Sequence, residues 1–502
     1  MKESIAMNQN PLVQFLKKLP HEFTKADMLK FIEEKEIKMV NFRYVAEDGR
    51  LKTLNFVVTN REYIEQVLSA GERVDGSNIF PSYIHAGSSD LYVAPRFRTA
   101  FMDPFSEIPA LSFLCSYYDK DGKQLENSPE FILKKALQSF EKTTGFTFQA
   151  MGELEYYVIA DKEDLYLAPN QKGYHESTPF AKFEQFRNEC MLLIAQSGGM
   201  IKYGHSEVGN FTLGDKIYEQ NEIEFLVTDV VDAADQLVVA KWIIRNLAYQ
   251  YGLNVTFAPK ITEGKAGSGL HIHTRIVDKN GQNRMVENGK LNTTAKTAIA
   301  GYMTCASSLT AFGNTNPTSY FRLVPHQEAP TSICWGDRNR SVLVRVPLGW
   351  THKNDMIADI NPMEEASQND LSQKQTVEFR CPDGSADVYL LLAGLVIAAR
   401  HGFEMERALE FAEKTYVDVN IHKAEHREKL ESLDQLPASC WDSAEELSIH
   451  RNIFENHDVF PAAMIDDIIK RLKSYQDQNV REEIKERPEK MMELVNEYFH
   501  CG

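Results

Sequence analysis

The segment GELEYYVIAD at residues 152–161 alternates between polar and apolar side chains along most of its length. In an extended chain, side chains two positions apart point to the same side, so Glu153 and Glu155 share one face, while Leu154 and Val158 share the other. The pattern predicts a strand with one face in a core. Its other face carries two neighbouring carboxylates, which require water or a cation beside them.

Four further segments show the same alternation. They are NEIEFLV at 221–227, GLHIHTRI at 269–276, SVLVRVP at 341–347 and TVEFRCP at 376–382. Their polar faces carry glutamate, histidine and arginine: Glu222, Glu224, His271, His273, Arg275, Arg345, Glu378 and Arg380. Each segment taken singly is typical of a half-exposed antiparallel strand with a solvated side.

The five segments together favour a different interpretation of the polar faces. An outer sheet face usually carries lysine and threonine, with charges of both signs. Carboxylates suit Mg²⁺ or Mn²⁺, imidazole suits Mn²⁺ better than Mg²⁺, and arginine makes planar bidentate contacts with phosphate. The residue types therefore predict a site for divalent cations and phosphate, held rigidly on strands.

The order of patterns along the chain predicts two domains. Residues 38–60 contain two β-rich runs around the turn signal EDG, which indicates a hairpin in a small β-rich domain. A polar, turn-rich link at about 115–128 marks the expected boundary. The expected domains therefore cover residues 1–120 and 121–502.

Three helical features are expected after this link. Ser128 and Pro129 favour the start of a helix. The apolar run at 388–399 is too short to span a bilayer and predicts a buried helix. The mixed charges at 461–499 predict a solvated, amphipathic surface helix or a subunit contact.

Composition and charge exclude several classes of protein. The 502 residues are 43% hydrophobic and 25% charged, which is typical of an ordinary soluble protein. The 55 basic and 72 acidic residues give a net charge of -17, which disfavours nucleic acid as a partner. Seven scattered cysteines, with no signal segment and no membrane span, favour a cytoplasmic protein with reduced thiols.

Eight segments carry a resemblance to a known family. They are VDGSNI at 74–79, GELEYYV at 152–158, KGYHESTP at 172–179, HSE at 205–207 with QNE at 220–222, GSGLHIH at 267–273, NPTSYFRLVPHQEAP at 316–330, RNRSVLVRVP at 338–347 and VEFRCPD at 377–383. In this order they resemble the glutamine synthetase family. One such match is weak, whereas eight in the family's order make chance implausible.

The resemblance implies an α+β fold. A small β-grasp amino-terminal domain is followed by a large catalytic domain, in which a curved antiparallel sheet is flanked by helices and ends in a helical tail. It also implies two ions of Mg²⁺ or Mn²⁺, one held by Glu155, Glu207 and Glu222 and the other by Glu153, His271 and Glu378. The cations would offset the repulsion between the paired glutamates.

The implied reaction joins ammonia to the γ-carboxylate of L-glutamate with ATP as co-substrate. Phosphorylation of the carboxylate supplies a good leaving group, and ammonia then attacks the γ-glutamyl phosphate. Arg340, Arg345 and Arg380 match the family's phosphate-facing arginines, and His273 matches a residue on the nucleotide side. Arg322, Gly267 and His271 match glutamate contacts.

The ammonium pocket and the assembly are also implied by the resemblance. The pocket positions are Asp75, Tyr174, Glu207 and Glu328, with Glu328 on the flap that closes over the intermediate. In the family the segment around Asp75 reaches the active site of the adjacent subunit. The expected partners are glutamate, ammonium, ATP and further copies of the chain in a dodecamer of stacked rings, with neither nucleic acid nor membrane.

Three departures from the family pattern leave alternatives open. Asn78 replaces a common serine, and Ala266 precedes GSG where asparagine is typical, which removes an expected amide contact to glutamate. The stretch between Glu207 and Glu222 is unusually long, which weakens Glu207 as a metal ligand. A relative that ligates glutamate to a polyamine or ethanolamine remains an alternative, although Asp75 and Tyr174 favour ammonia. A non-catalytic member commonly loses metal ligands or arginines, and this chain keeps them.

Overall fold

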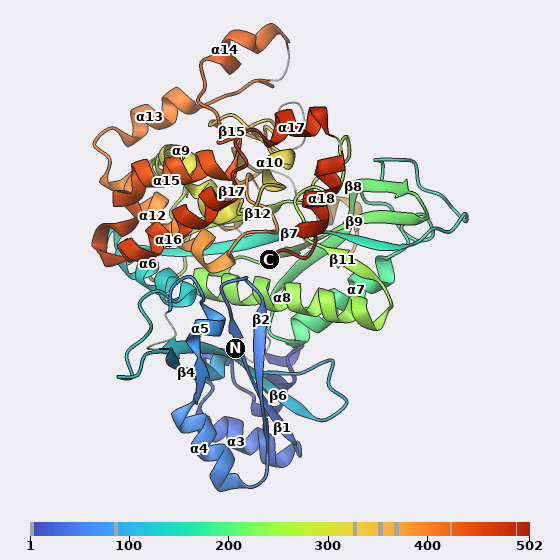
Figure 1. The fold of residues 1–502 in the computed structure, drawn as a ribbon, viewed down its shortest axis with the longest axis vertical. Helices are drawn as coiled ribbons and strands as arrows, with labels where there is room; N and C mark the ends of the chain where they lie inside the picture. Colours follow the sequence, from blue (N-terminus) through green and yellow to red (C-terminus); the bar gives the residue numbers. More distant parts are fainter. Residues whose placement is uncertain are drawn as a thin grey trace.

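The computed structural model describes residues 5–84, 89–324, 329–349, 355–365, 371–421, 424–487 and 489–502. Figure 1 shows a smaller amino-terminal part and a larger part in which helices pack beside a second sheet. The end of the chain lies near the junction between the two parts. The architecture is α+β, as the sequence predicts.

The amino-terminal part is built on a sheet of six described strands in the order β2-β1-β6-β4-β3, with β5 paired to β6. The strands are β1 (Met39–Val45), β2 (Leu51–Val57), β3 (Glu72–Asp75), β4 (Asp90–Pro95), β5 (Phe101–Met102) and β6 (Ala110–Tyr118). The antiparallel pairing of β1 with β2 confirms the predicted hairpin. Gly49 adopts φ 76° in its turn, a conformation that favours glycine.

The helices described with full bounds in this part are α2 (Pro11–Leu16), α3 (Lys25–Glu34), α4 (Arg61–Ala70) and α5 (Gly76–Ile79). Helix α3 begins at a capping box in which Thr24 and Asp27 bond to each other's backbone N–H groups. The apolar sides of α3 and α4 and of the sheet form one buried cluster, which includes Phe31, Val67 and Phe113.

The larger part contains a sheet of nine described strands, with the main order β15-β16-β17-β12-β7-β9-β8 and with β10 and β11 paired to β7. They are β7 (Thr147–Asp161), β8 (Ile201–Leu213), β9 (Lys216–Phe225), β10 (Thr228–Asp229), β11 (Asn254–Thr256), β12 (Leu270–Val277), β15 (Trp335–Asp337), β16 (Val344–Val346) and β17 (Val377–Phe379). All pairs are antiparallel except β15 with β16. A separate hairpin joins β13 (Val286–Glu287) and β14 (Lys290–Leu291).

Helices cover the apolar face of this sheet. Those that contribute to the main core are α6 (Pro129–Thr144), α7 (Glu184–Gln196), α8 (Val230–Gln250), α9 (Thr293–Gly313), α12 (Val388–Glu404), α15 (Cys440–Glu455) and α16 (Ala462–Ser474). Smaller buried clusters hold α13 (Ala408–Thr415), α17 (Val480–Glu486) and α18 (Glu489–Glu497). Shorter helices are α10 (Ser319–Arg322), α11 (Met356–Ile360) and α14 (Arg427–Glu431). The predicted buried helix is confirmed, because nearly every side chain of α12 is buried.

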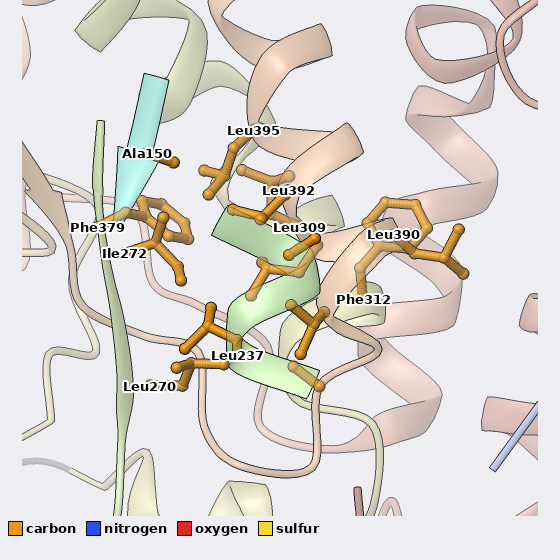
Figure 2. Packing of buried hydrophobic residues seen from close by; sticks show 14 of the residues in the cluster. Ala150, Leu237, Leu270, Ile272, Leu309, Phe312, Phe379, Leu390, Leu392 and Leu395 are labelled. Atoms are coloured by element: carbon orange, nitrogen blue, oxygen red, sulfur yellow. The ribbon is translucent and has the colours of Figure 1, made fainter. Parts of the chain in front are cut away.

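The alternation along the strands separates core from site. Figure 2 shows Ala150, Ile272 and Phe379 of three strands facing Leu309 of α9 and Leu392 of α12. On each strand, the residues that alternate with these apolar ones face the other side of the sheet. This sidedness follows from the strand period of two and places the polar residues together on one surface.

Three details differ from the sequence expectations. Strand β6 extends to Tyr118, so the first residues of the expected link are buried in the sheet. Ser128 occupies the N-cap position of α6, but its hydroxyl makes no capping hydrogen bond. The expected surface helix at 461–499 is three helices, and Ile465 and Ile468 of α16 lie in the main core, because their apolar side has a partner in α15.

The two parts are joined by a buried ion pair. Arg96, which follows β4, donates hydrogen bonds of 2.7 and 2.9 Å to the two oxygens of Asp235 on α8. Arg43 stacks on Trp242 of the same helix, with its guanidinium carbon 4.1 Å from the ring centroid. These contacts hold the amino-terminal sheet against α8, which also packs on β7.

Among the described residues no single helix is long and apolar enough to cross a membrane. The pair Val388–Glu404 and Ala408–Thr415 meets that test only in combination, and it is bent by 116°. Helix α12 of this pair is packed in the core.

Candidate functional site

A cavity of about 1130 Å³ lies on the polar face of the large sheet. Thirteen of the residues singled out in the sequence line it: Glu153, Glu155, Tyr174, Glu207, Glu222, Gly267, His271, His273, Arg322, Arg340, Arg345, Glu378 and Arg380. They come from segments spread between residues 153 and 380, so it is the folding of the chain that brings their side chains together. The cavity is large enough for a nucleotide and an amino acid together.

Two of the expected site residues are not part of this cavity as described. Asp75 lies at the end of β3, where its carboxylate is exposed and accepts hydrogen bonds from Ser77 and Asn78. Asn78, one of the departures from the family pattern, thus bonds to Asp75 at 2.5 Å. Glu328 lies outside the described residues.

Strand register explains how the acidic side chains meet. Glu153 of β7 lies between His271 of β12 and Glu224 of β9. One step along the same face, Glu155 pairs with Glu222 of β9, which in turn pairs with His205 of β8. Neighbouring strands lie about 4.8 Å apart, so side chains in these rows contact one another.

Three groups of side chains are spaced to hold a metal ion among the described residues. The first contains Glu153, His271 and Glu378, the second Glu155, Glu222 and His271, and the third His205, Glu222 and Glu224. Within each group the ligand atoms lie within 4.8 Å of one another. Two groups share His271, and two share Glu222, so the three positions form a continuous acidic cleft.

The first group is held by two imidazoles. His271 Nδ1 lies 3.0 Å from Glu153 Oε2, and His273 Nε2 lies 2.7 Å from Glu153 Oε1. Burial alone would raise the pKa of Glu153, but the two histidines hold it well below its usual range. Burial lowers the pKa of His273, and the Glu153 carboxylate more than offsets that effect, so the pKa is raised. Both shifts favour the charged forms of Glu153 and His273.

The pKa of Glu222 is shifted in the opposite direction from that of Glu153. Burial raises its pKa well above the ordinary value, and the carboxylates of Glu153, Glu155 and Glu207 raise it further. Glu155 accepts hydrogen bonds from the Gly269 N–H at 2.7 Å and from the Gln220 amide at 3.0 Å. A cation in this cleft would relieve the repulsion.

Arginines border the first group. Arg345 and Arg380 donate hydrogen bonds of 2.9 and 3.0 Å to the two oxygens of Glu378. Arg380 also bonds to the carbonyl oxygen of Arg340 and so positions the loop that carries it. Arg322 is anchored by the carbonyl oxygen of Cys381 at 2.8 Å and approaches His271 Nε2 at 3.4 Å.

Glu207 lines the cavity but lies outside the three groups. The register of β8 on β9 shifts between Ser206 and Asn210, an irregularity that contains Glu207. Its carboxylate accepts a hydrogen bond from the Val208 N–H at 2.7 Å and lies 3.9 Å from His205 Nδ1. The long stretch before Glu222 forms the extended ends of β8 and β9, which meet at Gly214.

Several cavity residues were assigned no individual role from the sequence. They are Lys202, Tyr203, His205, His175 and Lys260. Glu224 follows the same alternation as Glu222, so the pattern placed it on the correct face. The contribution of Lys202 and Tyr203 from β8 could not be recognised, because the segment around them carries no metal-binding pattern of its own.

Aromatic rings line one side of the cavity. The rings of Tyr174 and His175 stack with centroids 4.2 Å apart, and the ring of His205 lies 4.4 Å from His175. His175 adopts φ 59°, an uncommon conformation for a residue with a side chain. Burial lowers the pKa of His205, which favours the neutral ring.

Comparisons with known families agree with the geometry. The family model described as glutamine synthetase, catalytic domain, matches residues 126–491, and the model described as glutamine synthetase, beta-Grasp domain, matches residues 36–120. The chain is 30% identical to a glutamine synthetase of Pyrococcus furiosus over 418 residues, covering 82% of this chain and 85% of the relative. It is 28% identical to that of Methanococcus maripaludis, covering 85% and 92%.

Solved structures share the fold. The glutamine synthetase of Plasmodium falciparum, solved by cryoEM, aligns with a TM-score of 0.73 at 18% identity and covers 91% of this chain and 97% of its own. A structure titled GmaS/ADP complex aligns with a TM-score of 0.72 at 18% identity, covering 90% and 96%. These likenesses confirm the predicted fold, including the amino-terminal β-grasp domain.

Proposed function

Because the chain belongs to the glutamine synthetase family, we propose that it is an ATP-dependent glutamate-ammonia ligase. The reaction joins ammonia to the γ-carboxylate of L-glutamate through γ-glutamyl phosphate and yields L-glutamine, ADP and phosphate. The observation that carries the proposal is the convergence of acidic, imidazole and guanidinium groups from distant segments in one cavity.

The residues present fit two divalent ions. Glu153, His271 and Glu378 would hold one ion, and Glu155 and Glu222, with Glu207 on the same wall, would hold the other. Oxygen ligands with one imidazole suit Mn²⁺ and also accept Mg²⁺ with water. Burial and neighbouring carboxylates raise the pKa of Glu222, and a cation in the cleft would stabilise its charged form. When bound, the ions would neutralise charge on the transferred phosphoryl group.

Arginines would complete the phosphoryl-transfer site. Phosphoryl transfer depends mainly on positioning and on stabilising charge at the equatorial oxygens. Arg345 and Arg380 are fixed by Glu378, and Arg340 lies on the same wall of the cavity. We assign the three guanidiniums to the phosphates of ATP and of the acyl phosphate, with His273 on the nucleotide side.

Glutamate would lie beside Arg322. One edge of this guanidinium is anchored by backbone oxygens, so the group is oriented before substrate arrives. We assign it to the α-carboxylate, because a guanidinium pairs well with a planar carboxylate. Gly267 and His271 line the cavity next to it and would contact the rest of the amino acid.

The acceptor side would capture ammonium and remove its proton. Tyr174 and Glu207 line this side of the cavity, and we assign Asp75 and Glu328 to it as well. Asp75 does not line the cavity of its own chain. We therefore propose that it serves a neighbouring copy in a homo-oligomer, a dodecamer of stacked rings. The seven free cysteines fit a cytoplasmic enzyme.

A larger amine is the second candidate acceptor. The rings of Tyr174, His175 and His205 line the acceptor side, and aromatic faces attract organic ammonium groups. Ligation of glutamate to ethanolamine or a polyamine would use the same phosphoryl-transfer residues. A purely structural role is disfavoured, because the carboxylates and arginines of the cavity are all present.

The test measures phosphate release from ATP and glutamate while ammonium, ethanolamine and putrescine are supplied in turn. Release with ammonium, together with formation of glutamine, is the expected result. If phosphate is released only with an organic amine, that amine and not ammonia is the acceptor. Absence of release with every amine, in folded protein supplied with Mg²⁺ or Mn²⁺, would refute the ligase.

A further inference from the structure

The third group of metal-binding side chains already contains a cation. His205, Glu222 and Glu224 bring their ligand atoms within 4.8 Å of one another, as in the two proposed ion sites. Lys202, which lines the same cavity, places its ammonium 2.6 Å from Glu224 Oε2. A lysine ammonium is a compact point charge, comparable in this respect to a metal ion.

Lys202 is held in this position by a second contact. Its ammonium lies 4.7 Å from the ring centroid of Tyr203, a cation–π arrangement. The hydroxyl of Tyr203 donates a hydrogen bond to the other oxygen of Glu224. Both oxygens of the Glu224 carboxylate therefore have donors, and only 7% of the Glu224 side chain is exposed.

A cation in the third group affects the second group, because the two groups share Glu222. Its carboxylate belongs to both the second and the third group, and His205 Nε2 lies 3.0 Å from its Oε2 atom. A divalent ion bound between Glu222 and Glu224 would share the Glu222 carboxylate with the ion of the second group. A cation that is part of the chain leaves Glu222 to the second group, because its stem fixes it beside Glu224.

The arginines on Glu378 differ from this arrangement in two respects. Arg345 and Arg380 spread their charge over planar guanidiniums, and both bind the outer carboxylate of the first group. Glu378 is not shared between groups. No lysine or arginine ion pair is described for Glu155, so the second group has no cation of the chain on either of its carboxylates.

We propose that Lys202 is a built-in cation of the acidic cleft, which occupies the third group and reserves Glu222 for the second. The inference rests on the proposed metal-dependent function and adds a positioning residue to the same site. A divalent ion placed beside the ammonium would be repelled by it, so the wild-type cleft binds two ions, not three. Removal of the ammonium opens the third position.

The experiment counts bound Mn²⁺ in the nucleotide-free protein by electron paramagnetic resonance of the free ion. We expect two ions per chain in the wild type and three in Lys202→Met. Lys202→Arg keeps a cation and retains two. Lys202→Met/Glu224→Gln also returns to two, because the third ion needs the Glu224 carboxylate. Circular dichroism checks folding, which should persist because 39% of the Lys202 side chain is exposed.

Lys265→Met is the matched control. Lys265 lines the same cavity, but its ammonium bonds to Asn170 at 3.0 Å. The substitution removes the same charge without touching the third group, so two ions are expected. An extra ion in both lysine variants would refute the inference, because net charge alone would then control binding.

The remaining outcomes separate the two proposals. Two ions in both wild type and Lys202→Met, or three in both, would refute the role of Lys202 and leave the ligase proposal intact. A wild-type protein that binds no Mn²⁺ would refute both. Phosphate release in the ammonium assay tests the ligase without reference to Lys202.

Discussion

The backbone N–H of Gly269 donates a 2.7 Å hydrogen bond to Oε2 of Glu155, which lies 114 positions earlier in the chain. The bond orients one carboxylate of the second donor group. It forms because the turn before β12 passes close to β7. Gly269 also lies close to the side chains of Arg322 and His271, and this close approach leaves no room for a side chain at residue 269.

Gly269→Ala tests this close approach. A Cβ atom at this position would lie 2.5 Å from Arg322 Nη2 and 2.9 Å from His271 Nε2. Both groups are expected to move, so the KM for glutamate should rise by roughly tenfold or more, a loss of about 1.4 kcal/mol, while the KM for ATP changes less. Steady-state kinetics with each substrate varied will measure this difference.

Gly281→Ala is the control for Gly269→Ala. Gly281 has φ 77°, and no heavy atom lies within 4 Å of the position that its Cβ atom would occupy, so the substitution strains the backbone at a distance from the cavity. Its effect should be confined to stability. An unchanged glutamate KM in Gly269→Ala would contradict the proposed contact between this turn and the substrate site.

Glu155→Ala should abolish turnover without unfolding the chain. The carboxylate faces the cavity, so its removal leaves little core volume unfilled. We expect kcat to fall by roughly 10²-fold or more, since a group that stabilises charge in the transition state is lost. Thermal unfolding of the metal-free protein should change little. If the variant kept its activity but lost thermal stability, Glu155 would have a structural role and not a catalytic one.

Glu163→Ala is the matched control for Glu155→Ala. Glu163 is exposed and pairs with Lys182 at 2.8 Å, away from the cavity lining. Like Glu155→Ala, this substitution removes one glutamate carboxylate from the same region of the chain. Activity and thermal stability should both stay close to the wild-type values, because exposed ion pairs contribute little.

Glu222→Gln should stabilise the metal-free protein. The folded-state pKa of Glu222 is raised above its ordinary value of 4.5 by burial and by neighbouring carboxylates. The protonated group therefore favours the fold at low pH, and this contribution is lost as pH rises through the folded-state pKa. The unfolding temperature of the variant should exceed that of the wild type at about pH 8, and the difference between the two should be smaller at about pH 5.

Added Mn²⁺ supplies the control for Glu222→Gln. The ion should raise the unfolding temperature of the wild type, because it binds the folded state, and raise that of the variant less. Differential scanning calorimetry at both pH values will measure these shifts. An equal Mn²⁺ effect in both proteins would remove Glu222 from the metal site.

Arg96→Ala should destabilise the junction between the two parts of the chain. The substitution leaves Asp235 and Glu130 buried without the guanidinium that contacts both. Breaking one side of a buried ion pair costs about 3–5 kcal/mol. Arg98→Ala is the matched control, because Arg98 pairs with Asp232 at the surface with 43% of its side chain exposed and should cost less than about 1 kcal/mol.

Chemical denaturation will compare the two arginine variants. A loss of similar size in both would mean that the buried pair adds no more than the exposed one. The amino-terminal sheet would then be held against α8 mainly by its other contacts, among them those of Phe101 and Arg43 with Trp242.

The sequence by itself determined which side chains face the cavity on β7, β9, β12 and β17. The period of two in a strand is a local property, so alternation of Glu153 with Leu154, or of Glu378 with Phe379, is sufficient to separate polar face from core. The order of the motifs was also sufficient to identify the family, which the comparisons confirm.

Only the tertiary structure decided which of these side chains meet. Register between strands depends on partners far apart in the chain, so the sequence could not place Lys202 and His205 of β8 beside Glu224 and Glu222 of β9. The irregularity that turns Glu207 toward the Val208 N–H is likewise a property of pairing. Local alternation selects a face, whereas non-local pairing selects the neighbours on that face.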